Sequence, residues 1–241
     1  NKVLIPEGEA FESSLVGILL DSEGHLQKQF VLDPLVCDCC SIDSAIFDSG
    51  NVVVCYRNRD KNEVRDTFYV RGNPLTPESF GEPQSTRVEQ WKTDVCPMNG
   101  PAIGSFGRFT TIAFFTNKPW ETERLQVSLS VGGGKKFMLA TIISAIGTLG
   151  RPAVAYLNED ISVVSWLQSI GDECWWVARA VPHKGQPGPR VRIAKVDSNI
   201  NANKLNLVRS ESGVIASYQA GEDINFSLIE LKQGSVDAAE R

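Results

Sequence analysis

The sequence is built on an internal repeat of about 50 residues. Four short runs rich in β-branched and aromatic residues each end in an aromatic side chain. These aromatics are Tyr56, Phe115, Trp166 and Tyr218, at spacings of 59, 51 and 52 residues. Runs of this composition, bounded by Gly, Asn or Asp, are typical of β-strands. A similar run precedes each of them, and one or two more runs follow, so that most repeats hold four expected strands.

Four strands in about 50 residues match the size of one β-propeller blade. We therefore expect an all-β fold, a β-propeller of four-stranded antiparallel blades, with a plain β-sandwich as the alternative. The segment between Gly134 and Gly147 has some helical character, but it is short, and we expect a strand and a loop there. The fourth strands of the three complete blades are expected at residues 84–88, 136–140 and 190–194.

The repeat predicts a single propeller domain over residues 1–241. Its expected parts are a partial blade 1–35, complete blades 36–92, 93–149 and 150–200, a partial blade 201–232 and a polar tail 233–241. Residues 15–19 and 29–32 look like a third and a fourth strand, so the propeller is expected to be incomplete at its N-terminus. A segment upstream of this chain, another chain, or a closing N-terminal strand in a small ring would each complete it.

The net charge of the chain makes some classes of binding partner unfavourable. The formal net charge is −5 and the isoelectric point is about 5.2, which provides no general basic field for nucleic acid. No run approaches 18 apolar residues, so no membrane span is expected. The first 30 residues lack the pattern of a signal peptide.

One turn and three longer stretches carry a family resemblance. The turn keeps Ser130, Gly134 and Phe137 of the Asp-box pattern, with Gly132 at the Asp position and Lys136 at the Thr position. The stretches are VCDCCS at 36–41, YRNRDKNEVRD at 56–66 and DVCPMNGPAI at 94–103. With the blade spacing, the chain resembles bacterial sialidase-like (BNR, Asp-box repeat) propeller proteins over nearly its full length.

The resemblance implies a register for the blades. Asp-box turns lie on the bottom face of such propellers. The segments that lead into the innermost strands, here called the lead-in segments, then lie on the top face near the axis. The loops between second and third strands lie there too, and ligands bind on this face.

This register brings Cys96 next to Cys37, Cys39 and Cys40, because they occupy lead-in segments of neighbouring blades. Three interpretations stay open. Cys96 forms a disulfide with one of the three, which requires Cα atoms about 5 to 6 Å apart and an oxidising, extracytoplasmic (periplasmic or secreted) location. Alternatively, two or three thiolates bind a soft metal such as copper(I) or zinc, with Met98 nearby. In the third interpretation the thiols are free and buried.

Charged and polar residues of the expected top face are candidates for ligand binding. Arginine side chains bind carboxylates in a bidentate manner, as an acidic sugar would require. The candidates are Arg57, Arg59, Arg65, Asp66, Asn99, Arg151 and Lys204. In the alternative interpretation, the charges of the 56–66 loop pair with one another across a solvated hairpin, and Arg151 and Lys204 only solvate the rim.

The resemblance to sialidases also implies an arginine cluster, a carboxylic acid near the leaving oxygen and a tyrosine nucleophile. The acid candidates are Asp38, Asp60 and Asp94, and Tyr218 is a tyrosine candidate. The chain departs from this pattern, because Arg151 alone occupies an inner-strand arginine position. Three functions are carried forward. We favour a binding module for a glycan or protein ligand; the alternatives are an exo-glycosidase acting on an acidic sugar and a metal-handling protein.

Overall fold

The computed structural model describes residues 13–118, 121–196, 204–220 and 223–230, and within them nearly all regular structure is β-strand. The predicted polar tail 233–241 lies outside these residues. A single 3₁₀ turn, η1 (Pro77–Ser79), interrupts the described strands. No helix in the described part of the chain has the length and apolar composition that crossing a membrane requires.

Three four-stranded antiparallel sheets follow one another along the chain, and each pairs its strands in sequence order. The first consists of β3 (Asp43–Ile46), β4 (Val52–Arg57), β5 (Thr67–Gly72) and β6 (Gln84–Ser85). The second consists of β7 (Ala102–Phe106), β8 (Phe109–Thr116), β9 (Arg124–Ser130) and β10 (Thr141–Ser144). The third consists of β11 (Thr148–Tyr156), β12 (Ile161–Ile170), β13 (Glu173–Pro182) and β14 (Val191–Val196).

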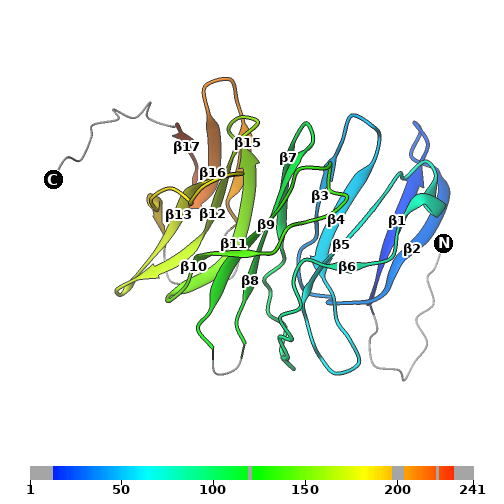
Figure 1. The fold of residues 1–241 in the computed structure, drawn as a ribbon, viewed down its shortest axis with the longest axis horizontal. Helices are drawn as coiled ribbons and strands as arrows, with labels where there is room; N and C mark the ends of the chain where they lie inside the picture. Colours follow the sequence, from blue (N-terminus) through cyan, green and yellow to red (C-terminus); the bar gives the residue numbers. More distant parts are fainter. Residues whose placement is uncertain (1–12, 119–120, 197–203, 221–222, 231–241) are drawn as a thin grey trace.

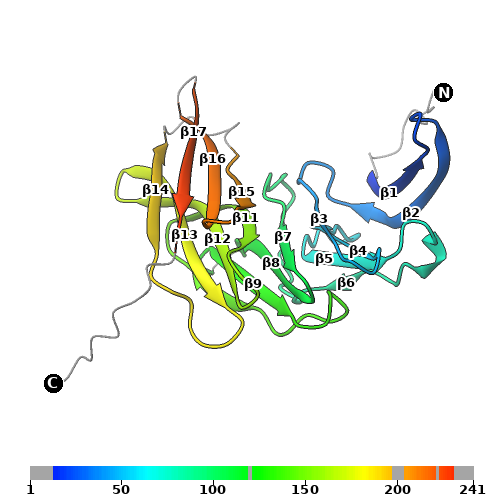
Figure 2. The same ribbon diagram turned by 90° about the horizontal axis from the view of Figure 1, so that it is seen from above.

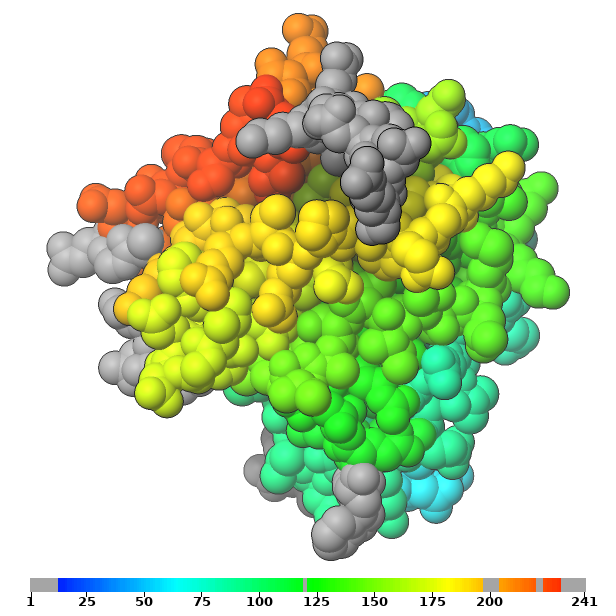
Figure 3. Space-filling model, turned by 60° about the vertical axis from the view of Figure 1, so that its left-hand side comes forward, coloured from blue at the N-terminus to red at the C-terminus, as the bar shows by residue number. Residues whose placement is uncertain are grey.

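Two smaller sheets flank these three. The hairpin of β1 (Ser13–Leu20) and β2 (Leu26–Val36) precedes them, and β15 (Asn206–Arg209), β16 (Val214–Ala220) and β17 (Asp223–Ile229) follow. The sheets stand side by side in chain order, and within the described residues they do not close into a ring (Figures 1 and 2). The fold is thus an all-β, open propeller of four-stranded antiparallel blades, as predicted. Figure 3 views it from the end formed by β13, β14 and β17.

Packing of both faces of each sheet explains this architecture. Alternate residues of a strand point to opposite faces. In β8, Ile112 and Phe114 pack against the first sheet, whereas Ala113 and Phe115 pack against the third. The same division places Trp166 of β12 toward the second sheet and Leu167 toward the last. The middle sheets are therefore covered on two sides, and the central residues of β8 and β12 are buried on both faces.

Two predicted fourth strands differ from the structure. Strand β6 ends at Ser85, and four residues further on the backbone N–H groups of Glu89, Gln90 and Trp91 donate to the Asp66 carboxylate. The expected strand 136–140 instead forms at β10, because the turn after β9 is lengthened by glycines. Gly133 and Gly134 both have positive φ. The segment between Gly134 and Gly147 is a loop and a strand, as expected.

The first strands of successive sheets contact one another, β3 with β7, β7 with β11, and β11 with β15. Their lead-in segments approach so closely that glycine is required. A Cβ atom on Gly100 would lie 1.9 Å from the carbonyl oxygen of Ser41, and one on Gly150, where φ is +83°, would lie 2.3 Å from the Asn99 side chain. These contacts hold the lead-in segments together around the axis.

We expect Gly100→Ala to lower the free energy of unfolding by about 1 to 3 kcal/mol, because the new methyl group overlaps the Ser41 backbone. Urea unfolding measures the change. Gly81→Ala is the matched control, since nothing lies within 4 Å of its Cβ position, and it should stay within about 0.5 kcal/mol of the wild type. Equal effects of the two substitutions would contradict the close approach of the lead-in segments.

Candidate functional site

Residues in or next to the four innermost strands line one cavity of about 210 Å³. Each strand contributes, so the cavity lies where β3, β7, β11 and β15 meet. The lining includes Ser41 and Asp43 before and in β3, Pro101 before β7, Pro152 in β11, and Lys204 and Asn206 at the start of β15. We call this space the axial cavity. Its position agrees with the register that the sequence resemblance implied.

The axial cavity is polar and carries both signs of charge. The Asp43 carboxylate accepts the backbone N–H of Ser44 at 2.8 Å and that of Ile103, in β7, at 2.9 Å. It therefore links two sheets as well as lining the cavity. Lys204 and Ser41 are exposed. An ammonium group, a hydroxyl group and the Asn206 amide can thus reach a ligand without first breaking a buried contact.

Arg57 is 1% exposed at the end of β4 and is fully engaged with backbone. Its guanidinium donates to the carbonyl of Asn99 at 2.8 and 3.0 Å, to that of Arg65 at 2.7 Å and to that of Phe115 at 2.8 Å. It also lies 4.6 Å from the Trp91 ring centroid. These are the contacts of a structural residue, so we leave Arg57 out of the ligand-binding set.

Two other predicted ligand-binding residues are also buried, and both form hydrogen bonds with backbone groups. Asp66 accepts three backbone N–H groups, as described above, and Asn99 joins the next sheet. The Asn99 amide donates to the carbonyl of Leu149 at 2.9 Å and accepts the N–H of Arg151 at 2.7 Å. Arg57 and Asn99 therefore form a chain of contacts through three consecutive sheets.

Arg59 and Arg65 pair with the same carboxylate, Glu63. Arg59 binds it in a bidentate manner, with N–O distances down to 2.6 Å, and Arg65 donates at 2.8 Å. The hydrogen bonds from Arg59 first, and then from Arg65, lower the pKa of Glu63. Arg59 and Arg65 thus pair with a carboxylate of their own loop, as the alternative interpretation of these charges expects.

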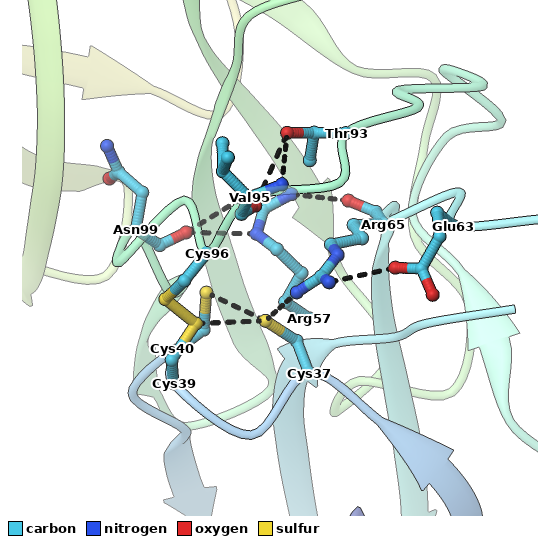
Figure 4. The surroundings of a disulfide bond; sticks show 10 residues. All are labelled: Cys37, Cys39, Cys40, Arg57, Glu63, Arg65, Thr93, Val95, Cys96 and Asn99. Carbon is cyan, nitrogen blue, oxygen red and sulfur yellow. Dashed lines mark hydrogen bonds and ion pairs between the residues drawn. A yellow bond between two sulfur atoms is a disulfide. The ribbon is translucent and has the colours of Figure 1, made fainter. Parts of the chain in front are cut away.

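Four cysteines meet beside this loop (Figure 4). Cys39 forms a disulfide with Cys96, with Cα atoms 6.1 Å apart and a sequence separation of 57. The predicted disulfide to Cys96 is therefore present, and Cys39 is its partner. Cys37 and Cys40 are free and buried. The Cys37 sulfur lies 3.3 Å from the Cys40 sulfur and 3.5 Å from the Cys39 sulfur.

Two arginines surround the free thiols. Arg65 donates a hydrogen bond to the Cys37 sulfur at 3.3 Å, and Arg57 interacts electrostatically with Cys40. The contact with Cys40, the Cys39 backbone and Arg65 together hold the pKa of Cys37 well below its usual range. The same Cys37–Cys40 contact and burial raise the pKa of Cys40. Cys37 is therefore the more acidic thiol of the pair.

The sulfurs of Cys37, Cys39 and Cys40 lie within 4.8 Å of one another, which is compatible with a common metal ion. The Cys39 sulfur, however, is already bonded to Cys96. This leaves two thiols, fewer than the four ligands of a structural zinc site. In the disulfide-bonded state the donor set therefore falls short of a structural zinc site.

The predicted catalytic residues lie outside the axial cavity. Asp38 and Asp94 are exposed, and the Asp60 carboxylate accepts the N–H groups of Asn62 and Val64 in its own loop. The Tyr218 hydroxyl is 3.1 Å from that of Ser227, on the neighbouring strand β17. None of these four residues lines the axial cavity.

Of the predicted ligand-binding residues, Lys204 lines the axial cavity, and Arg151 precedes Pro152 in its wall. Sequence reasoning missed Ser41, Asp43 and Asn206. The available signal was positional, because all three lie at the start of an expected innermost strand. Their residue types alone carry no such signal.

Neither a protein-family model nor a curated protein sequence matches the chain. Solved structures that resemble it include Trypanosoma rangeli sialidase, with 13% identity and a TM-score of 0.49, over 93% of this chain and 41% of that one. The α-L-arabinofuranosidase from Lactobacillus brevis has 10% identity and a TM-score of 0.47, over 82% and 73% of the two chains. The α-L-arabinofuranosidase PaAbf62A from Podospora anserina has 11% identity and a TM-score of 0.44, over 73% and 64%.

The chain spans less than two thirds of the length of the Trypanosoma and Podospora proteins. All three TM-scores are below 0.5, and all identities are below 25%. We therefore assign the fold from the sheet order and packing described above, and take no function from these proteins.

We expect Arg57→Ala to lower the free energy of unfolding by roughly 3 kcal/mol or more, because three buried carbonyl groups lose a charged donor. Arg59→Ala, in the same loop, removes a partly exposed ion pair and should cost about 1 kcal/mol or less. Chemical denaturation of both variants provides the comparison. A loss for Arg57→Ala no larger than that for Arg59→Ala would contradict its structural role.

We expect Arg65→Gln to raise the pKa of Cys37, because the variant removes both a hydrogen bond and a positive charge from the thiolate. Titration of the ultraviolet absorbance of the thiolate measures the shift, with Lys61→Gln as an exposed control. In the wild type, the lowered pKa of Cys37 stabilises the fold fully above its unfolded pKa, and this stabilisation is lost as the pH falls through the folded value. A midpoint unchanged in Arg65→Gln would contradict the assignment.

Proposed function

We propose that this chain is a sialidase-like propeller used as a binding module, and that its axial cavity takes the terminal unit of an acidic glycan. The observation that carries the proposal is the convergence of four innermost strands on one polar cavity. Ligands of propellers are bound where such strands begin, near the axis, in the register that the sequence resemblance implies. The disulfide between Cys39 and Cys96 suits an oxidising, extracytoplasmic compartment.

The size of the cavity favours a small ligand group. Pockets for drug-sized ligands have volumes of about 300 to 1,000 Å³. The axial cavity, at about 210 Å³, is smaller and suits one sugar ring better than a polysaccharide segment. In this proposal the sugar enters with its terminal ring, and the remainder of the glycan stays outside.

The lining supports an acidic ligand. The Lys204 ammonium pairs with the carboxylate of the sugar, and the Ser41 hydroxyl and the Asn206 amide bind its hydroxyl groups. Asp43 also lines the cavity, where its carboxylate is already held by the N–H groups of Ser44 and Ile103. It accepts hydrogen bonds from sugar hydroxyls with its remaining lone pairs.

Binding is favoured over hydrolysis by the residue types of the lining. A sialidase-type hydrolase combines a carboxylic acid with a tyrosine nucleophile, and the described residues that line the cavity include no tyrosine. Among the cavity-lining residues Asp43 is the one carboxylate, and both of its oxygens accept backbone N–H groups. No observation at the cavity favours the exo-glycosidase, and the two free thiols of the cysteine cluster are fewer than a structural zinc site requires.

We expect saturable binding of sialic or glucuronic acid by isothermal titration calorimetry, weakened about tenfold or more in Lys204→Ala through loss of a charge-assisted hydrogen bond. Lys61→Ala, an exposed lysine away from the cavity, is the matched control and should bind like the wild type. Absence of binding to any acidic sugar, or equal affinity in Lys204→Ala, would contradict the proposal. Turnover of a fluorogenic sialoside by the wild type would instead identify a hydrolase.

A further inference from the structure

The cysteine cluster contains two redox pairs in contact, and the proposed function uses neither. One is the disulfide Cys39–Cys96, and the other is the dithiol of Cys37 and Cys40. The two cysteines of the dithiol have the C-x-x-C spacing, which places their sulfurs within bonding reach. Their observed separation is 3.3 Å.

We propose that these four cysteines form an internal thiol–disulfide relay, in which the buried dithiol passes two electrons to the disulfide that joins the first two lead-in segments. The Cys37 sulfur is 3.5 Å from the Cys39 sulfur. In Figure 4 it lies on the side of the Cys39 sulfur opposite to Cys96. A nucleophile in this place attacks Cys39 and displaces Cys96.

The first step exchanges one bond for another. The Cys37 thiolate attacks the Cys39 sulfur, the Cys37–Cys39 bond forms, and the Cys39–Cys96 bond breaks. The electron pair of the broken bond leaves with Cys96 as a thiolate. The surroundings prepare Cys37 for this role, because Arg65 donates a hydrogen bond to its sulfur and the Cys40 sulfur lies 3.3 Å away.

The second step resolves the intermediate. The Cys40 sulfur attacks the Cys37 sulfur and loses its proton to the Cys96 thiolate. The Cys37–Cys40 bond forms, and Cys39 leaves as a thiolate. Overall, Cys37 and Cys40 are oxidised, Cys39 and Cys96 are reduced, and no external oxidant or reductant is consumed.

The relay changes which free thiols lie at the surface of the protein. Cys37 and Cys40 are buried, whereas Cys96 is exposed and Cys39 is partly exposed. Exchange therefore moves a dithiol from the interior to the surface, where it meets disulfides or electrophiles in solution. It also removes the covalent link between the segments that lead into β3 and β7.

The test is disulfide mapping during alkylation of the intact chain. Protein purified without reductant is incubated anaerobically with N-ethylmaleimide, denatured in acid and digested. Trypsin releases the Cys37–Cys40 cluster on peptide 29–57 and Cys96 on peptide 93–108. We expect labelled Cys96 and Cys39 to accumulate, together with a disulfide between Cys37 and Cys40.

Variants separate the two steps. Cys37→Ser should slow the labelling of Cys96 at least about tenfold, because it removes the attacking thiolate. Cys40→Ser should let Cys96 be labelled while Cys37–Cys39 persists. Cys174→Ser, a free cysteine of β13 outside the cluster, is the matched control and should label like the wild type.

Two results would overturn the relay. One is a Cys39–Cys96 disulfide that stays intact throughout the labelling of the wild type, whether or not Cys37 reacts. The other is a purified protein with four free thiols in the cluster that binds zinc in stoichiometric amount, which would identify a metal site. Both readouts use the wild type and so do not depend on the folding of a variant.

Discussion

The guanidinium of Arg57 is the contact on which the arrangement of the top face depends. It belongs to the first sheet, yet it donates to carbonyl groups in its own loop, in the lead-in segment of the second sheet and in β8. Asn99 extends this link to the third sheet. A buried arginine with all these donors satisfied fixes three carbonyl positions at once, which an apolar side chain cannot do.

That fixed framework places two chemically different regions next to each other. The lead-in segments line the axial cavity with Ser41 and Pro101, and a few residues earlier they carry the cysteine cluster. Gly100 and Ser41 touch between the two. The cavity is polar and exposed, so it suits ligand binding. The Cys37–Cys40 dithiol is buried and Arg65 donates a hydrogen bond to it, so it suits exchange within the protein.

Positive charge near the cysteines has a different function from the one that sequence reasoning gave it. The arginines of the 56–66 loop do not face an open site. Arg57 holds backbone carbonyls, Arg59 pairs with Glu63, and Arg65 divides its donors between Glu63 and the Cys37 sulfur. Their charge stabilises a thiolate in the interior instead of an anionic ligand at the surface. The remaining exposed cation of the axial cavity, Lys204, is therefore the one assigned to the ligand.

The sequence by itself determined the all-β fold and the propeller, because strand periodicity and repeat length are local properties of the chain. The expectation that Cys96 lies beside the cysteine triplet came from the register that the family resemblance implies. Only the tertiary structure decided that Cys39 is the disulfide partner, that Arg57 is structural and that Asp43 lines the cavity. These outcomes depend on side-chain directions and on contacts between sheets, such as that between Gly100 and Ser41, and residues 59 positions apart along the chain carry no local signal of such contacts.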